Sequence, residues 1–345
     1  MTANSLVQLK KKDFETPNEV RWCPGCGDYA ILATVQKFLP SLGLPKENFA
    51  FISGIGCSSR FPYYMNTYGF HTIHGRAPAV ASGVKLANPD LSVWIITGDG
   101  DALSIGGNHL LHILRRNLDV NILLFNNRIY GLTKGQYSPT SEVGKVTKTT
   151  PSGSVDNPIN PIALALGAEA SFTARTMDVD AKHLEDTLRA AYEHKGTSFI
   201  EIYQNCVIFN DKSFEYVSER SVREEHRLLL KEGQLMIFGA EKNKGIAMVD
   251  NQPKVVTFTG GEAEAEKAGV LRFNPADRTM SGILSRLDYP EFPVPMGVLY
   301  KKERPVFEEA MIEQMTAAKN KKPAKASADE NLHELFHSGN TWQVG

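Results

Sequence analysis

The sequence predicts an α/β domain with a mostly parallel sheet and helices on both of its faces. Continuous apolar runs rich in β-forming residues occupy residues 91–97 and 120–125, and such runs are typical of parallel strands buried on both sides. Between them, residues 108–117 have apolar side chains at helical spacing. Strand, helix and strand in this order predict a right-handed βαβ unit.

The same patterns predict further elements on either side of this unit. Helices are expected at residues 28–39, 77–87, 160–170 and 180–195, and strands at 48–53 and 198–204. We expect Asp28 to cap the first helix, the GDGDALSIGG segment to form a loop, and 198–204 to be the last strand of the core. Residues 131–160 are rich in Gly, Ser, Thr and Pro and predict a long functional loop.

Composition limits the possible classes of protein. The chain has 345 residues, of which 42% are hydrophobic and 22% charged, with a formal net charge of −1. Nucleic-acid binding is not expected, because there is no overall basic field. No apolar run approaches the roughly 18 residues that span a bilayer, and the N-terminus lacks the apolar segment of a secretory signal. We therefore expect a cytoplasmic protein without a membrane contact.

Changes of composition divide the chain into five predicted segments. They are a polar N-terminal arm (1–20), the α/β domain (21–215), a C-terminal extension (216–316), a low-complexity linker expected to be disordered (317–330) and a tail (331–345).

Polar residues follow the two strands of the βαβ unit. Gly98-Asp99-Gly100 ends the first strand, and Asn126-Asn127 follows the second after 25 intervening residues. Each motif alone is also a common turn. Together they lie at the carboxyl edge of the sheet, where α/β proteins bind ligands. Carboxylate and amide oxygens suit Mg²⁺, and glycine lets the backbone approach a diphosphate.

The four cysteines form the second motif. Cys23 and Cys26 lie in a CPGCG turn, whereas Cys57 and Cys206 are distant in the sequence. Two disulfides are one alternative, but a chain of this size without a secretory signal favours metal or redox chemistry. By spacing alone, four thiolates suit Zn²⁺ and a [4Fe–4S] cluster about equally.

These motifs resemble those of the thiamine-diphosphate-binding β subunit of 2-oxoacid:ferredoxin oxidoreductases. The resemblance spans roughly residues 20 to 210 and includes WCPGCG, FISGIGCSSR, HTIHGRA, GDGDALSIGGNH and NNRIYGLTKGQ. It implies the thiamine diphosphate-binding fold for residues 21–215, together with the iron–sulfur ligands, and one [4Fe–4S] cluster on Cys23, Cys26, Cys57 and Cys206.

The resemblance also implies the remaining cofactor contacts. Mg²⁺ would bind the Asp99 and Asn127 side chains and the Ile129 carbonyl. Thiamine diphosphate would contact Ile55, Gly56, Cys57, Ser58, His74, Gly100, Asp101, Gly131 and Leu132. An isolated His74 would more often be a hydrogen-bonded loop histidine. Arg60 and Lys134 would hold the carboxylates of a 2-oxoacid, although each alone could be a surface ion pair.

The implied reaction is oxidative decarboxylation of a 2-oxoacid with coenzyme A to an acyl-CoA and CO₂. The substrate is expected to be 2-oxoglutarate, with pyruvate or another 2-oxoacid as the alternative. Electrons would pass through the cluster to ferredoxin or flavodoxin. An α subunit would supply a pyrimidine-binding domain and the activating glutamate, in an α2β2 heterotetramer. A non-redox thiamine decarboxylase with structural zinc and a non-catalytic scaffold subunit are the other classes.

Overall fold

The computed structural model describes residues 9–321, 327–340 and 342. The chain divides into two compact units, Met1–Glu308 and Glu309–Gly345. The first contains every predicted site residue. Across the described ranges, no helix has both the length and the apolar character needed to cross a membrane.

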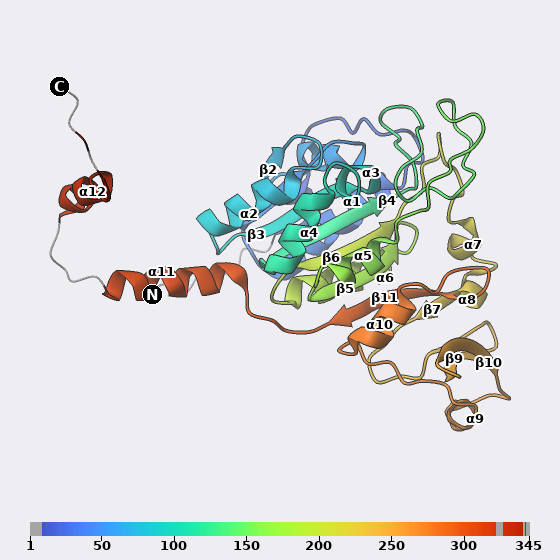
Figure 1. The fold of residues 1–345 in the computed structure, drawn as a ribbon. Coiled ribbons are helices and arrows are strands. Elements are labelled where there is room, and N and C mark those ends of the chain that lie inside the picture. Colours follow the sequence, from blue (N-terminus) through green and yellow to red (C-terminus); the bar gives the residue numbers. More distant parts are fainter. Residues whose placement is uncertain (1–8, 322–326, 341, 343–345) are drawn as a thin grey trace. The chain divides into compact units, whose positions relative to one another are not determined.

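One eight-stranded sheet organises the first unit (Figure 1). Neighbouring strands are parallel except β5 and β11, which are antiparallel. In spatial order the strands are β2 (Tyr68–His71), β1 (Phe49–Ser53), β3 (Ser92–Gly98), β4 (Val120–Asn126), β6 (Ser198–Tyr203), β5 (Phe172–Met177), β11 (Val294–Lys301) and β7 (Arg227–Leu229). The predicted α/β class with a mostly parallel sheet is confirmed.

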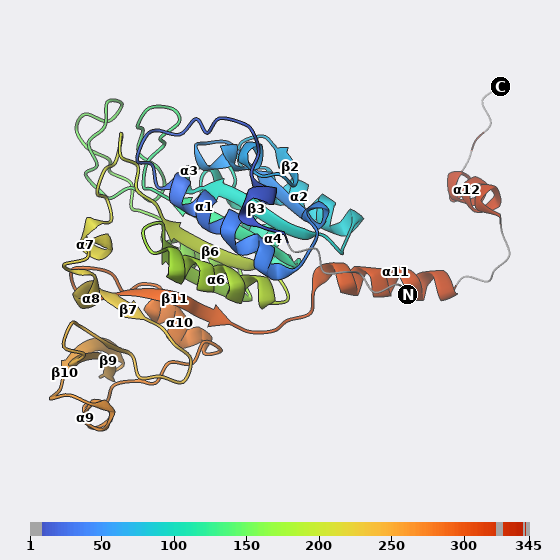
Figure 2. The same ribbon diagram turned by 180° about the vertical axis from the view of Figure 1, so that it is seen from behind.

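Helices cover both faces of this sheet, as predicted. One face carries α2 (Ala77–Ala87), α4 (Gly107–Arg116), α5 (Pro161–Gly167) and α10 (Arg278–Leu284), and the other carries α1 (Asp28–Phe38) and α6 (Ala181–Glu193) (Figures 1 and 2). Side chains of β3 alternate between the two cores: Ile95 faces the first set of helices, and Trp94 and Ile96 face the second. This alternation follows from the period of two in a strand.

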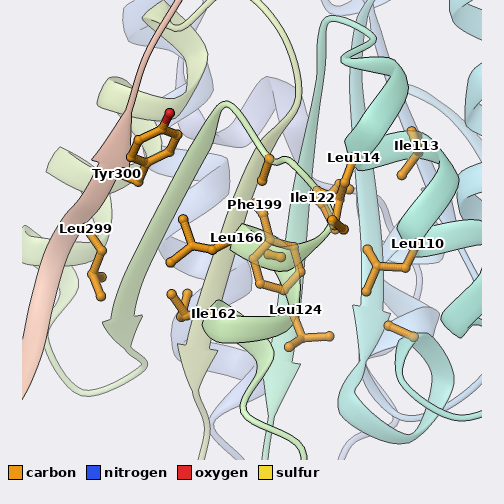
Figure 3. Close-up of a cluster of buried hydrophobic side chains, with 14 of the residues drawn as sticks. Leu110, Ile113, Leu114, Ile122, Leu124, Ile162, Leu166, Phe199, Leu299 and Tyr300 are labelled. Carbon is orange, nitrogen blue, oxygen red and sulfur yellow. The ribbon is translucent and has the colours of Figure 1, made fainter. Parts of the chain in front are cut away.

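The first core shows why the strands are continuous apolar runs. Ile122 and Leu124 of β4 and Phe199 of β6 pack with Ile162 and Leu166 of α5 (Figure 3). Helices on both faces leave these central strands without a solvent-facing side, so nearly every position is apolar.

The remaining elements surround this core. Short 3-10 helices occur at η1 (Lys11–Phe14), η2 (Leu39–Leu42), η3 (Lys46–Asn48) and η4 (Ser58–Tyr64). Short α-helices occur at α3 (Asp99–Ala102), α7 (Glu215–Ser218), α8 (Arg223–His226) and α9 (Glu262–Lys267). A separate antiparallel sheet contains β8 (Ile237–Phe238), β9 (Lys244–Val249) and β10 (Gln252–Thr257). Within the predicted N-terminal arm, Phe14 is fully buried.

Several predictions of local structure are wrong. Residues 198–204 are not the last core strand, because β11 enters the same sheet beside β5. Its proline and glycine hide it from pattern reading. The GDGDALSIGG segment is not entirely loop, since α3 begins at Asp99. Asp28 is the first residue of α1 rather than its cap, which is Gly27, and its side chain is buried.

Parts of the segment 317–330 are helical where the chain is described, and its disorder stays a prediction. Residues 317–321 belong to α11 (Phe307–Lys321), and 328–330 begin α12 (Ala328–Phe336). Ala, Lys and Glu favour helix formation, and Ser327 and Glu330 form a capping box. Residues 322–326, and positions 1–8, 341 and 343–345 of the predicted arm and tail, lie outside the described residues.

Truncation of the central core residue should measure this packing. Phe199 is fully buried, so Phe199→Ala should lower the free energy of unfolding by about 3–5 kcal/mol. Denaturant unfolding followed by circular dichroism measures the change. Val155→Ala, at an 86% exposed position, should change it by less than about 0.5 kcal/mol. Equal effects of the two substitutions would contradict this packing.

Candidate functional site

A cavity of about 520 Å³ lies where the loops after β1, β2, β3 and β4 meet. This volume is typical of a small-molecule site. Every residue predicted to contact the diphosphate, the thiamine or Mg²⁺ lines it: Ile55, Gly56, Cys57, Ser58, His74, Asp99, Gly100, Asp101, Asn127, Ile129, Gly131 and Leu132. The structure thus brings together twelve residues from four separate loops.

The Asp101 carboxylate joins three of these loops. Its Oδ2 accepts a hydrogen bond from the Thr97 hydroxyl at 2.6 Å. Its Oδ1 accepts from the backbone N–H groups of Ile55 at 3.1 Å and Gly75 at 2.7 Å. His74 Nδ1 lies 2.6 Å from the same oxygen. Asp101 therefore positions the walls of the cavity, in addition to lining it.

His74 combines both interpretations of its sequence motif. Because Asp101 Oδ1 accepts from two backbone N–H groups, the short contact requires His74 Nδ1 to donate. This orients the ring, which lines the cavity with 36% of its side chain exposed. A hydrogen-bonded loop histidine is thus also available to a ligand.

The Asp99 side chain is buried and held by the long loop. Its Oδ2 accepts hydrogen bonds from the hydroxyls of Ser138 at 2.6 Å and Thr140 at 2.5 Å. Burial raises the pKa of Asp99 to about 6, while these two hydrogen bonds act in the opposite direction. Since both donors bind Oδ2, they fix the orientation of the carboxylate at the cavity wall.

A chain of buried groups extends from Asp99 into the sheet. Thr140 Oγ1 also lies 2.9 Å from Asn126 Oδ1, and Asn126 Nδ2 donates to Glu201 at 2.8 Å. Glu201 pairs with Arg175 at 2.7 Å on the neighbouring strand. Thr140 thus lies between Asp99 and Asn126, whereas Asn127 lines the cavity.

Asn127 and Ile129 line the same cavity as Asp99. Asn127 Oδ1 accepts a hydrogen bond from the Ile129 N–H at 3.2 Å, and the Asn127 carbonyl accepts from Asn210 at 2.9 Å. Both residues line the cavity. An amide oxygen, a carbonyl oxygen and one carboxylate are a donor set that fits Mg²⁺ shared with a diphosphate.

Gly100 permits a close approach that any other residue would block. A Cβ atom there would lie 2.2 Å from Cε1 of Tyr130, and the Tyr130 hydroxyl donates to the Gly100 carbonyl at 2.9 Å. The glycine in the predicted diphosphate motif therefore admits the Tyr130 ring at the cavity wall.

A second cavity of about 250 Å³ contains all four cysteines. It shares Cys57, Asn127, Gly131 and Leu132 with the first cavity. A Cβ atom on Gly131 would lie 3.4 Å from the Cys57 sulfur and 3.6 Å from the Cys206 sulfur. The four thiols form no disulfide, so the two-disulfide alternative is wrong.

Burial disfavours thiolates in this second cavity. It raises the pKa of Cys57 to about 12 and also raises that of Cys26, and the Asp28 carboxyl adds to both shifts. Binding of a cationic metal centre would stabilise the thiolates and displace the thiol protons, which would offset the cost of ionising buried cysteines. In the described part of the chain, no three His, Cys, Asp or Glu side chains are arranged to hold a single metal ion.

Arg60 and Lys134 line the cysteine cavity and not the larger one. Arg60 Nε donates to the Tyr64 hydroxyl at 3.1 Å, and its guanidinium lies 5.8 Å from the Tyr63 ring centroid. Neither cation forms an ion pair with a described residue. The surface ion-pair alternative is therefore wrong for both within that range.

Sequence reasoning missed several residues of the two cavities. Trp22 Nε1 donates to the Cys57 carbonyl at 2.7 Å, and Tyr130 and Asp28 line the larger cavity. Burial raises the pKa of Asp28 to about 7. Adjacency to the CPGCG and NN motifs was the available signal for Trp22, Asp28 and Tyr130. Ser138 and Thr140 lie in a loop with many hydroxyls, where no pattern distinguishes them.

Comparisons with known proteins identify the family of this chain. A family model described as "Thiamine pyrophosphate enzyme, C-terminal TPP binding domain" matches residues 54–202. The 2-oxoglutarate oxidoreductase subunit KorB of Mycobacterium tuberculosis is 52% identical over 97% of this chain and 88% of that protein. The β subunit of 2-oxoacid:ferredoxin oxidoreductase 1 of Aeropyrum pernix is 49% identical over 55% of this chain and 60% of that protein.

A solved structure shares the whole architecture. The chain superposes on 2-oxoglutarate:ferredoxin oxidoreductase from Magnetococcus marinus, solved with 2-oxoglutarate, coenzyme A and succinyl-CoA bound, with a TM-score of 0.76 and 31% identity. The match covers 97% of this chain and 98% of that one.

The fold and the larger cavity define a thiamine diphosphate-binding domain of an oxidoreductase. More narrowly, the chain belongs to the β subunits of the 2-oxoacid:ferredoxin oxidoreductases. The family predicted from the sequence motifs is confirmed.

Adding a single methyl group at Gly100 should test the cavity geometry. Gly100→Ala should displace the Tyr130 ring, because the new Cβ atom would lie 2.2 Å from it. We expect the affinity for thiamine diphosphate, measured by calorimetry in the presence of Mg²⁺, to fall by at least about tenfold. Removal of the ring in Gly100→Ala/Tyr130→Ala should recover part of the loss.

Gly83 provides the matched control, because a Cβ atom there meets nothing within 4 Å. Gly83→Ala should leave thiamine diphosphate affinity unchanged. Normal affinity in Gly100→Ala would contradict the proposed position of the diphosphate.

Proposed function

We propose that this chain is the β subunit of an enzyme that converts 2-oxoglutarate and coenzyme A to succinyl-CoA and CO₂ and reduces ferredoxin through a [4Fe–4S] cluster. One observation carries the proposal: the thiamine diphosphate cavity and the four-cysteine cavity are adjacent and share Cys57 and Gly131. This adjacency leaves only a short path between a carbon centre that is oxidised and a centre that accepts electrons.

The larger cavity would hold thiamine diphosphate together with Mg²⁺. Thiamine diphosphate supplies the carbanion that adds to the 2-oxo carbon and stabilises the negative charge when CO₂ leaves. Asp99, Asn127 and the Ile129 carbonyl would hold Mg²⁺ beside the diphosphate. Ser138 and Thr140 keep the Asp99 carboxylate in one orientation, and Asp101 keeps His74 against the cavity.

The cysteine arrangement favours an iron–sulfur cluster over zinc. A structural Zn²⁺ would draw all four thiolates around one ion, whereas these cysteines line a cavity of about 250 Å³. In a [4Fe–4S] cluster each thiolate binds a different iron atom, so the sulfurs stand farther apart. A [4Fe–4S] cluster accepts electrons one at a time, which suits ferredoxin or flavodoxin as the next carrier.

The choice of 2-oxoglutarate is supported by relatives and by charge. The names of the Mycobacterium and Magnetococcus proteins specify 2-oxoglutarate. Arg60 and Lys134 are cations without a carboxylate partner among the described residues, and both lie at the cavity beside Cys57. A dicarboxylic 2-oxoacid would supply two such partners. Pyruvate, with one carboxylate, is the alternative substrate.

The active site also requires a partner chain. Thiamine enzymes use a glutamate against the aminopyrimidine ring, yet no described glutamate lines the cofactor cavity. We propose that an α subunit supplies it, in an α2β2 assembly. A cytoplasmic location fits four thiols that form no disulfide.

Co-purification with the partner subunit tests the proposal. The complex should contain iron and thiamine diphosphate, and should reduce ferredoxin only when 2-oxoglutarate and coenzyme A are both present. The isolated chain should be inactive. Pyruvate-dependent activity instead would reassign the substrate, and stoichiometric zinc without iron would indicate a non-redox decarboxylase. Full activity after Asp99→Ala would indicate a scaffold role.

Loss of one cysteine should remove the cluster. Cys206→Ser in the complex should abolish the iron-dependent absorbance and ferredoxin reduction, because a thiolate ligand is missing. Iron analysis and absorption spectra measure this. The nearby exposed substitution Lys212→Ala should retain full iron content, and iron retained in Cys206→Ser would contradict the assigned ligand set.

Removal of the Arg60 guanidinium, which lines the same cavity as Cys57, should weaken substrate binding. Arg60→Ala should raise the KM for 2-oxoglutarate by roughly tenfold to hundredfold, since a hydrogen bond to a charged group contributes about 1.5–3 kcal/mol. Arg60→Lys should give a smaller increase. The remote exposed Lys37→Ala serves as the control. An unchanged KM in Arg60→Ala would remove this residue from the substrate site.

A further inference from the structure

A buried glutamine lies against one of the four cysteines. Gln204 directly follows β6 and is 1% exposed. Its side-chain Nε2 lies 3.2 Å from the Cys26 sulfur, within hydrogen-bonding distance. The same nitrogen donates to the Asn205 carbonyl at 2.7 Å. The two protons of this amide therefore have two different acceptors, one of which is a cysteine sulfur.

The orientation of the Gln204 amide is determined by its surroundings. Exchanging its nitrogen and oxygen would place Oε1 2.7 Å from the Asn205 carbonyl oxygen, and two acceptors at that distance repel. The Gln204 backbone N–H donates to the Asn126 carbonyl at 2.9 Å, which fixes the main chain. The second Nε2 proton is consequently directed at the Cys26 sulfur.

The carbonyl oxygen of the Gln204 side-chain amide has no hydrogen-bond partner among the described residues. Gln204 Oε1 is buried and accepts no hydrogen bond, and an unmet buried acceptor costs about 1–3 kcal/mol. A glutamine with only a packing role would be replaceable by an apolar residue at no such cost. A thiolate is a stronger acceptor than a thiol, so the contact with Cys26 strengthens when that sulfur is ionised.

We propose that Gln204 raises the reduction potential of the [4Fe–4S] centre through its hydrogen bond to Cys26. The inference rests on the proposed cluster and goes beyond it. One-electron reduction adds negative charge to the cluster and its thiolates, and hydrogen bonds to the sulfurs help to set the potential. An N–H dipole directed at a buried sulfur stabilises the reduced form, and low local polarity strengthens the effect.

Two carboxyl groups close to Cys26 and Gln204 explain why this hydrogen bond would matter for the reduction potential. Asp28 is buried and interacts with Cys26, and the Asp178 carboxylate accepts from the Asn205 N–H at 2.9 Å. Negative charge there opposes reduction of a cluster. Gln204 supplies a neutral donor that offsets part of this effect without adding a cation.

Redox titration of the complete complex tests the inference. Gln204→Met has a side chain of similar length without an N–H donor, and it should shift the midpoint potential of the cluster to a more negative value at unchanged iron content. Gln36→Met is the matched control, because Gln36 is also buried but donates to the Tyr64 carbonyl. Its midpoint potential should equal that of the wild-type complex.

A second measurement keeps the test decisive if Gln204→Met loses its cluster. Pulsed EPR of the reduced wild-type complex, containing glutamine labelled with ¹⁵N in the side chain, should detect an amide nitrogen coupled to the cluster. Full iron content with an unchanged potential in Gln204→Met would overturn the role of Gln204 but not the proposed cluster. The absence of an amide-nitrogen coupling in the wild-type complex would do the same. A wild-type complex without iron would overturn the proposed cluster itself.

Discussion

The hydrogen bonds of the Asp101 carboxylate are the constraint on which the site depends. One side chain holds Thr97 at the end of β3, the backbone of Ile55 after β1 and that of Gly75 after β2, and it also orients His74. These loops have no regular hydrogen-bond ladder of their own. A single buried carboxylate with four partners thus converts three strand ends into one rigid wall, and satisfied buried networks specify a unique arrangement.

A buried ion pair extends this order from the sheet to the long loop. Arg175 and Glu201 face each other on β5 and β6, where an unpaired charge would be costly. Glu201 holds Asn126, and Asn126 meets Thr140, which in turn binds Asp99. The loop from 127 to 160 is therefore anchored by polar groups that begin inside the sheet. These contacts explain why Glu201, a charged residue, stands in the middle of the otherwise mostly apolar strand β6.

Motif residues were predictable because they follow strands that are themselves recognisable. Apolar runs located β3 and β4, so Asp99 and Asn127 could be assigned to one edge of the sheet. Ser138 and Thr140 were not predictable, since the path of their loop is set by contacts distant in sequence. Gln204 was missed for the same reason: its partner Cys26 is 178 residues away. The helices α11 and α12 were not predicted, because hydrophobic periodicity is weak in that part of the sequence.

The sequence by itself determined the strand-edge position of Asp99 and Asn127, because parallel strands end at a common edge. The family and most of the residues that line the cofactor cavity came from the resemblance of its motifs to a known family. Only the tertiary structure decided that Arg60 and Lys134 lie with the cysteines, that β11 completes the sheet, and that Gln204 meets Cys26. The physical reason is that side-chain contacts between distant segments depend on how loops pack, and no local periodicity encodes that packing.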